Sequence, residues 1–265
     1  MTIAVLLALA AYAVLSLGMV LMKKGIPWIG YKGPKDGAWR RDLRTWIAGF
    51  LLSNLYVVPS LMALKTLTPH IFAAFAGFGV IVLVLLAAAV LGEKLHRSDI
   101  YYTAAIFLSI ILLNLYEPTP GKDALNIPLL AGVAAFPLLL FATAFTKGIS
   151  PTVRAVMFAS VSGTSTGMVV VLMKTLVEVH GFRVGDYLHS PYIYLYLFFS
   201  LTAFIALQLA YRIESMMRTG PVQYGSSIVY PAVCSALVFG NVIRPIQIAA
   251  LAAIILAIVG ILRKH

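Results

Sequence analysis

Residues 2–22 read TIAVLLALAAYAVLSLGMVLM, an apolar run without a single charged side chain. A helix crosses the roughly 30 Å hydrocarbon core of a bilayer with about 20 residues, so this run is long enough to span it. A signal peptide would have a shorter apolar core, of about 7–15 residues, behind a basic start. Residues 1–3 carry no Lys or Arg. The run therefore predicts a retained transmembrane helix.

Runs of the same kind recur along the whole chain. Charged residues make up 11% of the sequence, hydrophobic residues 61%, and mean hydropathy is +0.96, whereas a soluble domain carries about a quarter charged residues. Solid apolar blocks also exclude the alternating strands of a β-barrel. We expect an all-α integral membrane protein, a single polytopic domain over residues 1–265 in contact with the lipid bilayer. Its nine transmembrane helices would lie at about 2–22, 46–64, 70–92, 99–116, 127–146, 154–174, 192–211, 221–240 and 246–262.

The basic residues are distributed unevenly between the segments that join these spans. If the N-terminus lies outside, 15 of the 20 Lys and Arg residues fall on the inner side, seven of them between the first two spans. The positive-inside rule describes this bias. It predicts a multi-pass protein of the plasma or inner membrane, with the N-terminus outside and the C-terminus cytoplasmic. The net charge of +11 is then a topology signal, and we expect no nucleic-acid partner.

The chain contains an internal echo. Ser16-Leu-Gly-Met-Val-Leu-Met-Lys23 ends the first span, and Ser165-Thr-Gly-Met-Val-Val-Val-Leu-Met-Lys174 ends the sixth. We interpret this as a repeat: repeat 1 at about 2–117, a linking helix at about 127–146, which Pro128 and Pro137 weaken, and repeat 2 at about 154–263. One extra crossing inverts the second four-helix copy against the first. Inverted repeats are characteristic of secondary transporters, whose substrate site lies near the midplane between the halves.

Neutral polar residues occur at membrane depth, where each needs a partner, a cavity or water. Two hypotheses stay open for them: lining of a substrate pathway, or hydrogen bonding between helices. Pro231 is a candidate for a different reason, because proline frees a backbone carbonyl that can face a cavity. The candidate pathway residues are Asn54, Gln208, Gln223, Tyr224, Ser226, Ser227, Tyr230 and Pro231.

Small residues and carboxylates complete the set of candidates. Ser160, Gly163 and Gly167 share one face of the sixth span, which favours close helix packing. Glu93 and Glu214 lie at cytoplasmic span ends, where each is either a weak metal ligand or half of an interfacial ion pair with Lys94 or Arg212. No nucleophile–base pattern or phosphate-binding loop stands out, so we expect no enzyme activity and no cofactor.

Several stretches together resemble a known family. These are Leu21-Met-Lys-Lys-Gly25 before a long basic segment, Trp46-Ile-Ala-Gly49, Gly92-Glu-Lys-Leu95, the sixth span from Ser160 to Lys174, and Gln208 with Tyr211 ahead of Val229-Tyr-Pro231. In this order, over about residues 5–262, they resemble the NIPA-like magnesium transporters, a branch of the drug/metabolite transporter superfamily. The resemblance implies a nine-helix carrier or channel-like protein for Mg²⁺, with other divalent cations as further candidate cargo.

Physical reasoning leaves the cargo open. Membrane voltage alone could drive Mg²⁺ inward, because two charges gain about 4.6 kcal/mol per 100 mV. Against this, Mg²⁺ is usually held through one or two carboxylates with retained waters, and only Glu93 and Glu214 lie near the membrane. A small organic metabolite, amino acid or drug is the second hypothesis, and a non-transporting scaffold is the third. A homodimer is a further expected state.

Overall fold

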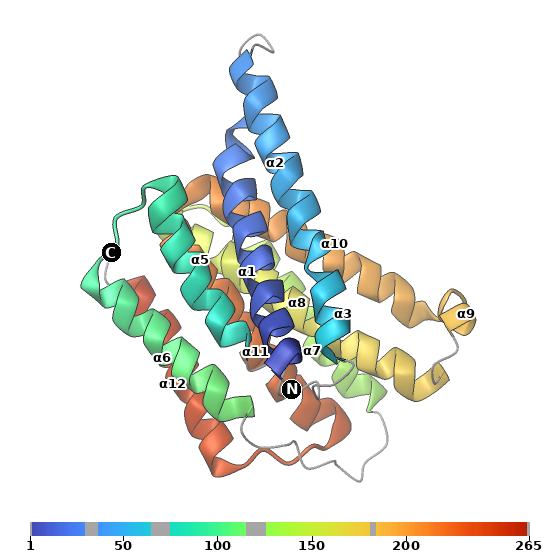
Figure 1. The fold of residues 1–265 in the computed structure, drawn as a ribbon. Coiled ribbons are helices and arrows are strands. Elements are labelled where there is room, and N and C mark those ends of the chain that lie inside the picture. The colour runs from blue at the N-terminus through green and yellow to red at the C-terminus, as the bar shows by residue number, and fades with distance from the viewer. Residues whose placement is uncertain (1, 30–36, 65–74, 115–125, 181–183, 264–265) are drawn as a thin grey trace. The chain divides into compact units, whose positions relative to one another are not determined.

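The computed structural model describes residues 2–29, 37–64, 75–114, 126–180 and 184–263, and within these ranges it is helical without a β-strand (Figure 1). The all-α prediction is confirmed for this part of the chain. Four stretches are long and apolar enough to cross a membrane: Thr2–Trp28, Pro151–Leu176, Pro191–Ile213 and Met216–Phe239. Shorter apolar helices occupy Ala76–Leu91, Ile127–Thr143 and Pro245–Ile261. These features are consistent with a multi-pass membrane protein.

The helices follow the predicted spans closely along the described residues. A helix or a pair of helices lies at each predicted span, although residues 70–74 of the third span are outside the described ranges. The number of membrane crossings stays a prediction. The elements are α1 (Thr2–Gly25), the 3₁₀ turn η1 (Ile26–Trp28), α2 (Gly37–Leu55), α3 (Val57–Leu64), α5 (Ala76–Leu91), α6 (Arg97–Asn114), α7 (Ile127–Thr143), α8 (Pro151–His180), α9 (Val184–Tyr187), α10 (Pro191–Ile213), α11 (Met216–Phe239) and α12 (Pro245–Arg263).

The chain divides into two compact units. Unit 1 comprises Met1–Glu117, Tyr211–Pro221 and Ala249–His265, and unit 2 comprises Pro118–Ala210 and Val222–Ile248. These borders cut across the two repeats expected from the sequence, because the start of α11 and most of α12 belong with the first helices. Two contacts explain why these later segments belong to unit 1. The Lys23 side chain donates to the carbonyls of Tyr211, near the end of α10, and of Glu214, directly after it, and Gly260 of α12 packs on the Tyr102 ring of α6.

In unit 1, α1 packs against α2, α3 and α5 (Figure 1). The contact with α2 is backbone against backbone, since a Cβ atom added to Gly18 would lie 2.5 Å from the Ser53 nitrogen. A Cβ atom on Gly49 would lie equally close, 2.5 Å from the Met22 nitrogen. Small residues allow membrane helices to approach in this way. The contact with α5 includes a buried hydrogen bond from Ser16 Oγ to the Gly79 carbonyl, 2.9 Å.

The second predicted span is not one helix. Within 46–64 the chain turns at Tyr56, between α2 and α3. Pro59 explains this break, because proline has no N–H to donate to the carbonyl four residues earlier, that of Leu55. The α2 helix also starts earlier than the span, at Gly37, so that its first two turns carry Arg40, Arg41 and Arg44.

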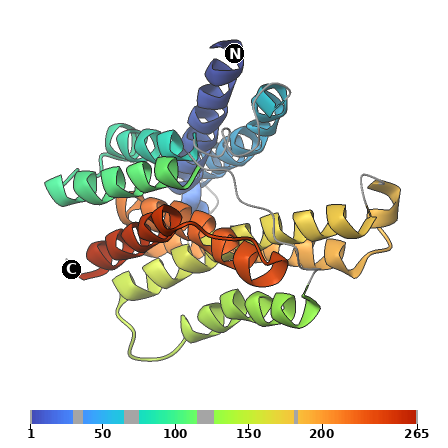
Figure 2. The same cartoon turned by 90° about the horizontal axis from the view of Figure 1, so that it is seen from below.

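In unit 2, α8 forms the core with α7, α10 and α11. Met168 and Leu172 of α8, Phe199 of α10 and Cys234 of α11 belong to one buried cluster, and α7 lies alongside α8 (Figure 2). The predicted fifth span is one helix, α7, over Ile127–Thr143 with Pro137 inside it, and it is one of the shorter apolar helices. Asn126 starts it by accepting a hydrogen bond from the Leu129 nitrogen, 3.1 Å, and Pro128 occupies the first turn, where its missing N–H costs nothing.

Candidate functional site

One close helix contact in unit 2 joins α8 to α11. A Cβ atom added to Gly163 would collide with the Gln223 carbonyl oxygen and lie 2.6 Å from the Ser226 Cβ. One turn further along α8, a Cβ atom on Gly167 would lie 2.6 Å from Pro231 Cδ and 3.2 Å from Tyr230 Cβ. The two groups of candidates therefore meet, with the predicted packing glycines pressed against the predicted pathway residues. We call this contact the α8–α11 seam.

Buried polar side chains of unit 2 concentrate in α8, α10 and α11. The three threonine hydroxyls are satisfied within their own helices: Thr164 Oγ1, for example, donates to the Ser160 carbonyl at 2.8 Å. Two side-chain atoms are different, because the buried Gln223 Oε1 and Ser165 Oγ have no hydrogen-bond partner among the described residues. The buried polar residues of α8, α10 and α11 in this unit are Ser162, Thr164, Ser165, Thr175, Thr202, Gln208, Gln223 and Ser226.

An unpaired buried acceptor is unusual. The exposed fraction of Gln223 is 8% and that of Ser165 is zero. Leaving a buried polar atom without a partner costs about 1–3 kcal/mol, and such atoms in native proteins commonly bind water, an ion or a ligand. Gln223 lies directly at the seam, so its amide oxygen is the strongest single pointer to a polar ligand in unit 2.

Tyr230 is held from a neighbouring helix. Its hydroxyl donates to the Val133 carbonyl of α7, and its ring stacks on Phe136 with 5.9 Å between centroids. Ser227 Oγ donates within its own helix, to the Tyr224 carbonyl at 2.8 Å. Tyr224 is itself buried. The Tyr230 and Ser227 side chains thus have structural partners, which makes them weaker ligand candidates than Gln223.

The two predicted amides outside α11 have different surroundings. Gln208 of α10 is 7% exposed and belongs to unit 2. Asn54 is exposed and belongs to unit 1. The Asn54 Nδ2 donates to the Phe50 carbonyl of its own helix at 2.8 Å, directly before the turn at Tyr56. Asn54 therefore closes the end of α2.

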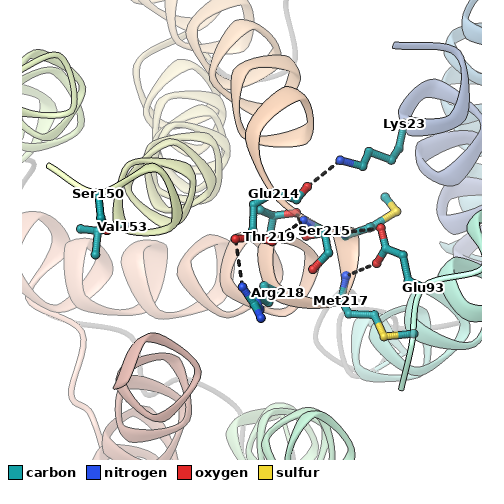
Figure 3. A network of polar contacts seen from close by, with 10 residues as sticks. Lys23, Glu93, Ser150, Val153, Glu214, Ser215, Met217, Arg218 and Thr219 are labelled. Atoms are coloured by element: carbon teal, nitrogen blue, oxygen red, sulfur yellow. Dashed lines mark hydrogen bonds and ion pairs between the residues drawn. The ribbon is translucent and has the colours of Figure 1, made fainter. Parts of the chain in front are cut away.

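The two candidate metal ligands lie in a polar network of unit 1 (Figure 3). Gly92 ends α5 in the left-handed conformation, φ 68°, and Glu93 follows it. Both Glu93 carboxylate oxygens accept hydrogen bonds from the first turn of α11, Oε1 from the Met216 nitrogen at 2.8 Å and Oε2 from the Met217 nitrogen at 2.9 Å. The negative charge lies at the positive end of the helix dipole, which stabilises both partners.

Glu214 occupies the other side of this network. Its Oε1 accepts from the Ser215 nitrogen at 2.8 Å, and its Oε2 forms a 3.0 Å ion pair with Arg218 Nη1. The Lys23 ammonium at the end of α1 donates to the Glu214 carbonyl at 2.5 Å and to the Tyr211 carbonyl. We call this network the α1–α5–α11 junction. Its chemistry is that of helix capping and ion pairing.

The junction leaves little room for a cation. Each of the four carboxylate oxygens of Glu93 and Glu214 already accepts a bond from a protein donor, and the Lys23 ammonium lies beside Glu214. Among the described residues, no group of three or more His, Cys, Asp or Glu side chains could hold a metal ion. The geometry thus favours the ion-pair hypothesis for these two residues over the metal-ligand hypothesis.

Sequence reasoning did not anticipate the partners in either unit. Lys94 and Arg212 were the expected partners of the two glutamates, yet the structure brings in Met216, Met217 and Arg218 from further along the chain. In unit 2, the Lys174 ammonium lies 3.8 Å from the centroid of the Phe239 ring. The repeated lysines that end spans one and six were the one sequence signal for these contacts. Comparisons with protein-family models, with curated proteins and with solved structures find no match to the chain.

Proposed function

We propose that this chain is a multi-pass transporter of the drug/metabolite type, with nine crossings, two inverted repeats and no enzyme activity. The observation that carries the proposal is the buried Gln223 Oε1 at the α8–α11 seam, which has no partner among the described residues. A polar acceptor inside helices of membrane-spanning length is costly without a ligand or water. A transported polar solute that occupies this position in passing would account for it.

A contact between the first and third spans occurs in each half and supports the repeat. In the first half, Ser16 of the first helix bonds to Gly79 of the third span. In the second half, Gly163 of the first helix packs on Gln223 of the third span. Lys23 and Lys174, which the sequence echo pairs, also both make specific contacts, Lys23 with carbonyls and Lys174 with an aromatic ring. This correspondence is expected if the halves descend from one unit in opposite orientation.

The proposed pathway is lined by neutral polar groups. Gln223 and Ser226 contribute from α11, and Gln208 contributes from α10. A lining role for Asn54 is proposed separately, within unit 1. The membrane is the plasma or inner membrane, with the N-terminus outside, as the distribution of basic residues predicts.

Mg²⁺ is the first cargo that we propose. It dehydrates reluctantly and keeps several waters when bound, so amide and hydroxyl oxygens can hold it through its hydration shell without direct carboxylate ligands. Voltage supplies the driving force inward, and a coupled proton carrier is unnecessary.

A small organic solute is the second candidate, favoured by one specific observation. Both carboxylates nearest to the membrane are occupied in the α1–α5–α11 junction, which leaves neutral hydrogen-bonding groups as the available ligands. Neutral groups of this kind also suit an amino acid, a metabolite or a drug.

Substitution of Gln223 tests the proposed pathway. In proteoliposomes, Gln223→Met should reduce solute flux by about tenfold or more. The variant cannot form the hydrogen bond between the solute and Gln223 Oε1, which contributes about 1–3 kcal/mol. Thermal stability should stay equal or rise, since an unpaired buried acceptor disappears. The chain's single cysteine, Cys234, is buried in the same unit, so labelling of its thiol on heating reports unfolding.

Gln247→Met is the matched control. Gln247 is also buried, but its Oε1 accepts from the Arg244 nitrogen at 3.0 Å at the start of α12. This variant should lose stability and keep wild-type flux per folded protein. Wild-type flux in folded Gln223→Met would refute the pathway, and wild-type flux in Asn54→Ala and Gln208→Ala would assign these two amides to packing.

A further inference from the structure

All three tryptophans of the chain gather at one place. Trp28 of η1 lies against Trp39 and Trp46 of α2, with ring centroids 6.5 and 5.5 Å away and the rings edge to face. Phe50 extends this cluster by stacking on Trp46 at 5.7 Å. Tryptophan is enriched at the boundary between the hydrocarbon and the headgroups of a bilayer. The cluster thus marks a membrane surface at this end of α1 and α2.

The arginines of α2 point away from α1. The side of α2 that contacts α1 is fixed by close backbone approach, of Gly25 to Asp42 and Trp46 and of Gly18 to Ser53. At about 3.6 residues per turn, Arg40 and Arg44 lie on the opposite side of the helix and Arg41 lies on its flank. All three are exposed, the Arg41 side chain to 77%. Arg41 lies 3.6 Å from Asp42, which neutralises only part of this charge.

These arginines also lie at a defined depth. The expected membrane span begins at Trp46, and α2 continues before it as an unbroken helix back to Gly37. With a rise of 1.5 Å per residue, Arg44 is about 3 Å and Arg40 about 9 Å beyond Trp46 along the helix. The headgroup layer is about 5–8 Å thick on each side of the bilayer. The guanidinium groups can therefore reach lipid phosphates.

We propose that Arg40, Arg41 and Arg44, with the exposed Lys24 at the end of α1, form a binding site for anionic phospholipid headgroups. We call this the basic hairpin. Guanidinium groups bind phosphate oxygens with two parallel hydrogen bonds, and the Trp28–Trp39–Trp46 cluster holds the helix end at headgroup depth. The proposal requires membrane insertion but not transport, so its test does not depend on which solute the protein moves.

Membrane geometry favours a lipid over other anionic partners. The basic hairpin continues a membrane helix, so phosphates of the surrounding leaflet are present at high local concentration without any further recruitment. Each Lys or Arg near an anionic surface contributes about 1 kcal/mol of attraction. A soluble acidic protein or a nucleic acid would have to compete with that leaflet from solution.

Intrinsic fluorescence tests the site directly, because the tryptophans report on this hairpin alone. The full-length protein in neutral detergent micelles is titrated with short-chain phosphatidylglycerol and, separately, with short-chain phosphatidylcholine. We expect a saturable change in tryptophan emission with phosphatidylglycerol that phosphatidylcholine does not produce and that salt weakens. In Arg40→Gln/Arg41→Gln/Arg44→Gln, the affinity should fall by at least about tenfold.

Two variants serve as controls. Lys94→Gln/Arg97→Gln/Lys147→Gln removes three exposed charges elsewhere and should keep wild-type affinity, and Arg40→Lys/Arg41→Lys/Arg44→Lys should keep most of it. Equal responses to the two lipids, equal losses in the two glutamine variants, or an equal response to inorganic phosphate alone would overturn the lipid site. If the Arg40→Gln/Arg41→Gln/Arg44→Gln protein does not fold, the wild-type titrations test the proposal alone. A wild-type fluorescence response that salt leaves unchanged then refutes it.

Discussion

Glu93 shows how a charge at the edge of a membrane protein can be used for structure. Its carboxylate accepts two backbone N–H groups from the start of α11, groups that no carbonyl within the helix can satisfy. Its position follows from Gly92, whose left-handed backbone ends α5 and turns the chain towards α11. The residue joins the end of one helix to the beginning of another that lies more than a hundred positions later.

We predict that Glu93→Gln destabilises unit 1 by about 1–3 kcal/mol, because one charge-assisted acceptor is replaced by an amide nitrogen that cannot accept. Tryptophan emission during thermal unfolding measures this effect, since all three tryptophans belong to unit 1. Solute flux should fall only in proportion to the folded fraction.

Asp186→Asn is the control, because it removes a charge from an exposed side chain and should leave the midpoint unchanged. A Glu93→Gln protein of wild-type stability that no longer moves Mg²⁺ would show that Glu93 is a metal ligand after all.

The sequence predicted the existence of this charged end but not its contacts. Charged residues at span ends are visible in any hydropathy profile. The partners are not, because Glu93 and the two N–H groups that it accepts are separated by 123 and 124 positions. Gln223 was predicted as a polar residue at membrane depth, yet only packing could show that its oxygen is unpaired while Tyr230 is held by Val133.

At the scale of elements, the α8–α11 seam determines how unit 2 packs. Gly163 and Gly167 bring the two helices so close that neither position has room for a side chain of its own. The spacing of four residues between the two glycines places both on one face of α8. The predicted packing function of these glycines agrees with this geometry, and the seam fixes the position of Gln223.

We predict that Gly163→Ala destabilises unit 2 by about 1–3 kcal/mol, because the new methyl group must push the α11 backbone away. Gly132→Ala in α7 is the matched control, since a Cβ atom there meets nothing within 4 Å, and it should stabilise by up to about 1 kcal/mol. Thermal unfolding followed by labelling of Cys234 measures both. Equal midpoints for the two variants would contradict the seam.

The elements could be predicted largely from hydropathy, and the deviations have local causes. Hydropathy reports which residues meet lipid and not where a helix ends in water, so α2 and α8 extend beyond their predicted spans. The break at Tyr56 depends on Pro59, a residue that the apolar character of the span conceals. Pro137 is the opposite case, a proline that α7 accommodates without ending.

At the scale of the whole molecule, chain order and compact units do not coincide. The inverted repeat was predicted from matching sequence, whereas unit 1 also includes the start of α11 and most of α12. The grouping of these later segments with the first helices depends on long-range contacts, which a hydropathy profile does not report. The repeat and the orientation in the membrane therefore need a direct test.

We predict that Leu188 and Val242, both exposed, face the outside, and that Lys94 and Lys147 face the cytoplasm. Each is replaced by cysteine in a Cys234→Ala background and treated in intact cells with a membrane-impermeant maleimide. Leu188→Cys and Val242→Cys should react at once, and Lys94→Cys and Lys147→Cys only after permeabilisation. The reverse pattern would invert the topology, and labelling of all four at once would contradict it.

The most direct test of the central claim is solute flux into liposomes that contain the purified protein and a Mg²⁺-sensitive dye, with an imposed membrane voltage. We predict that Mg²⁺ enters faster than in protein-free liposomes and that a more negative interior accelerates the entry. Uptake of an organic solute in place of Mg²⁺ would contradict Mg²⁺ as the cargo and would still support a transport function. If neither Mg²⁺ nor any organic solute enters faster than in protein-free liposomes, the protein is not a transporter.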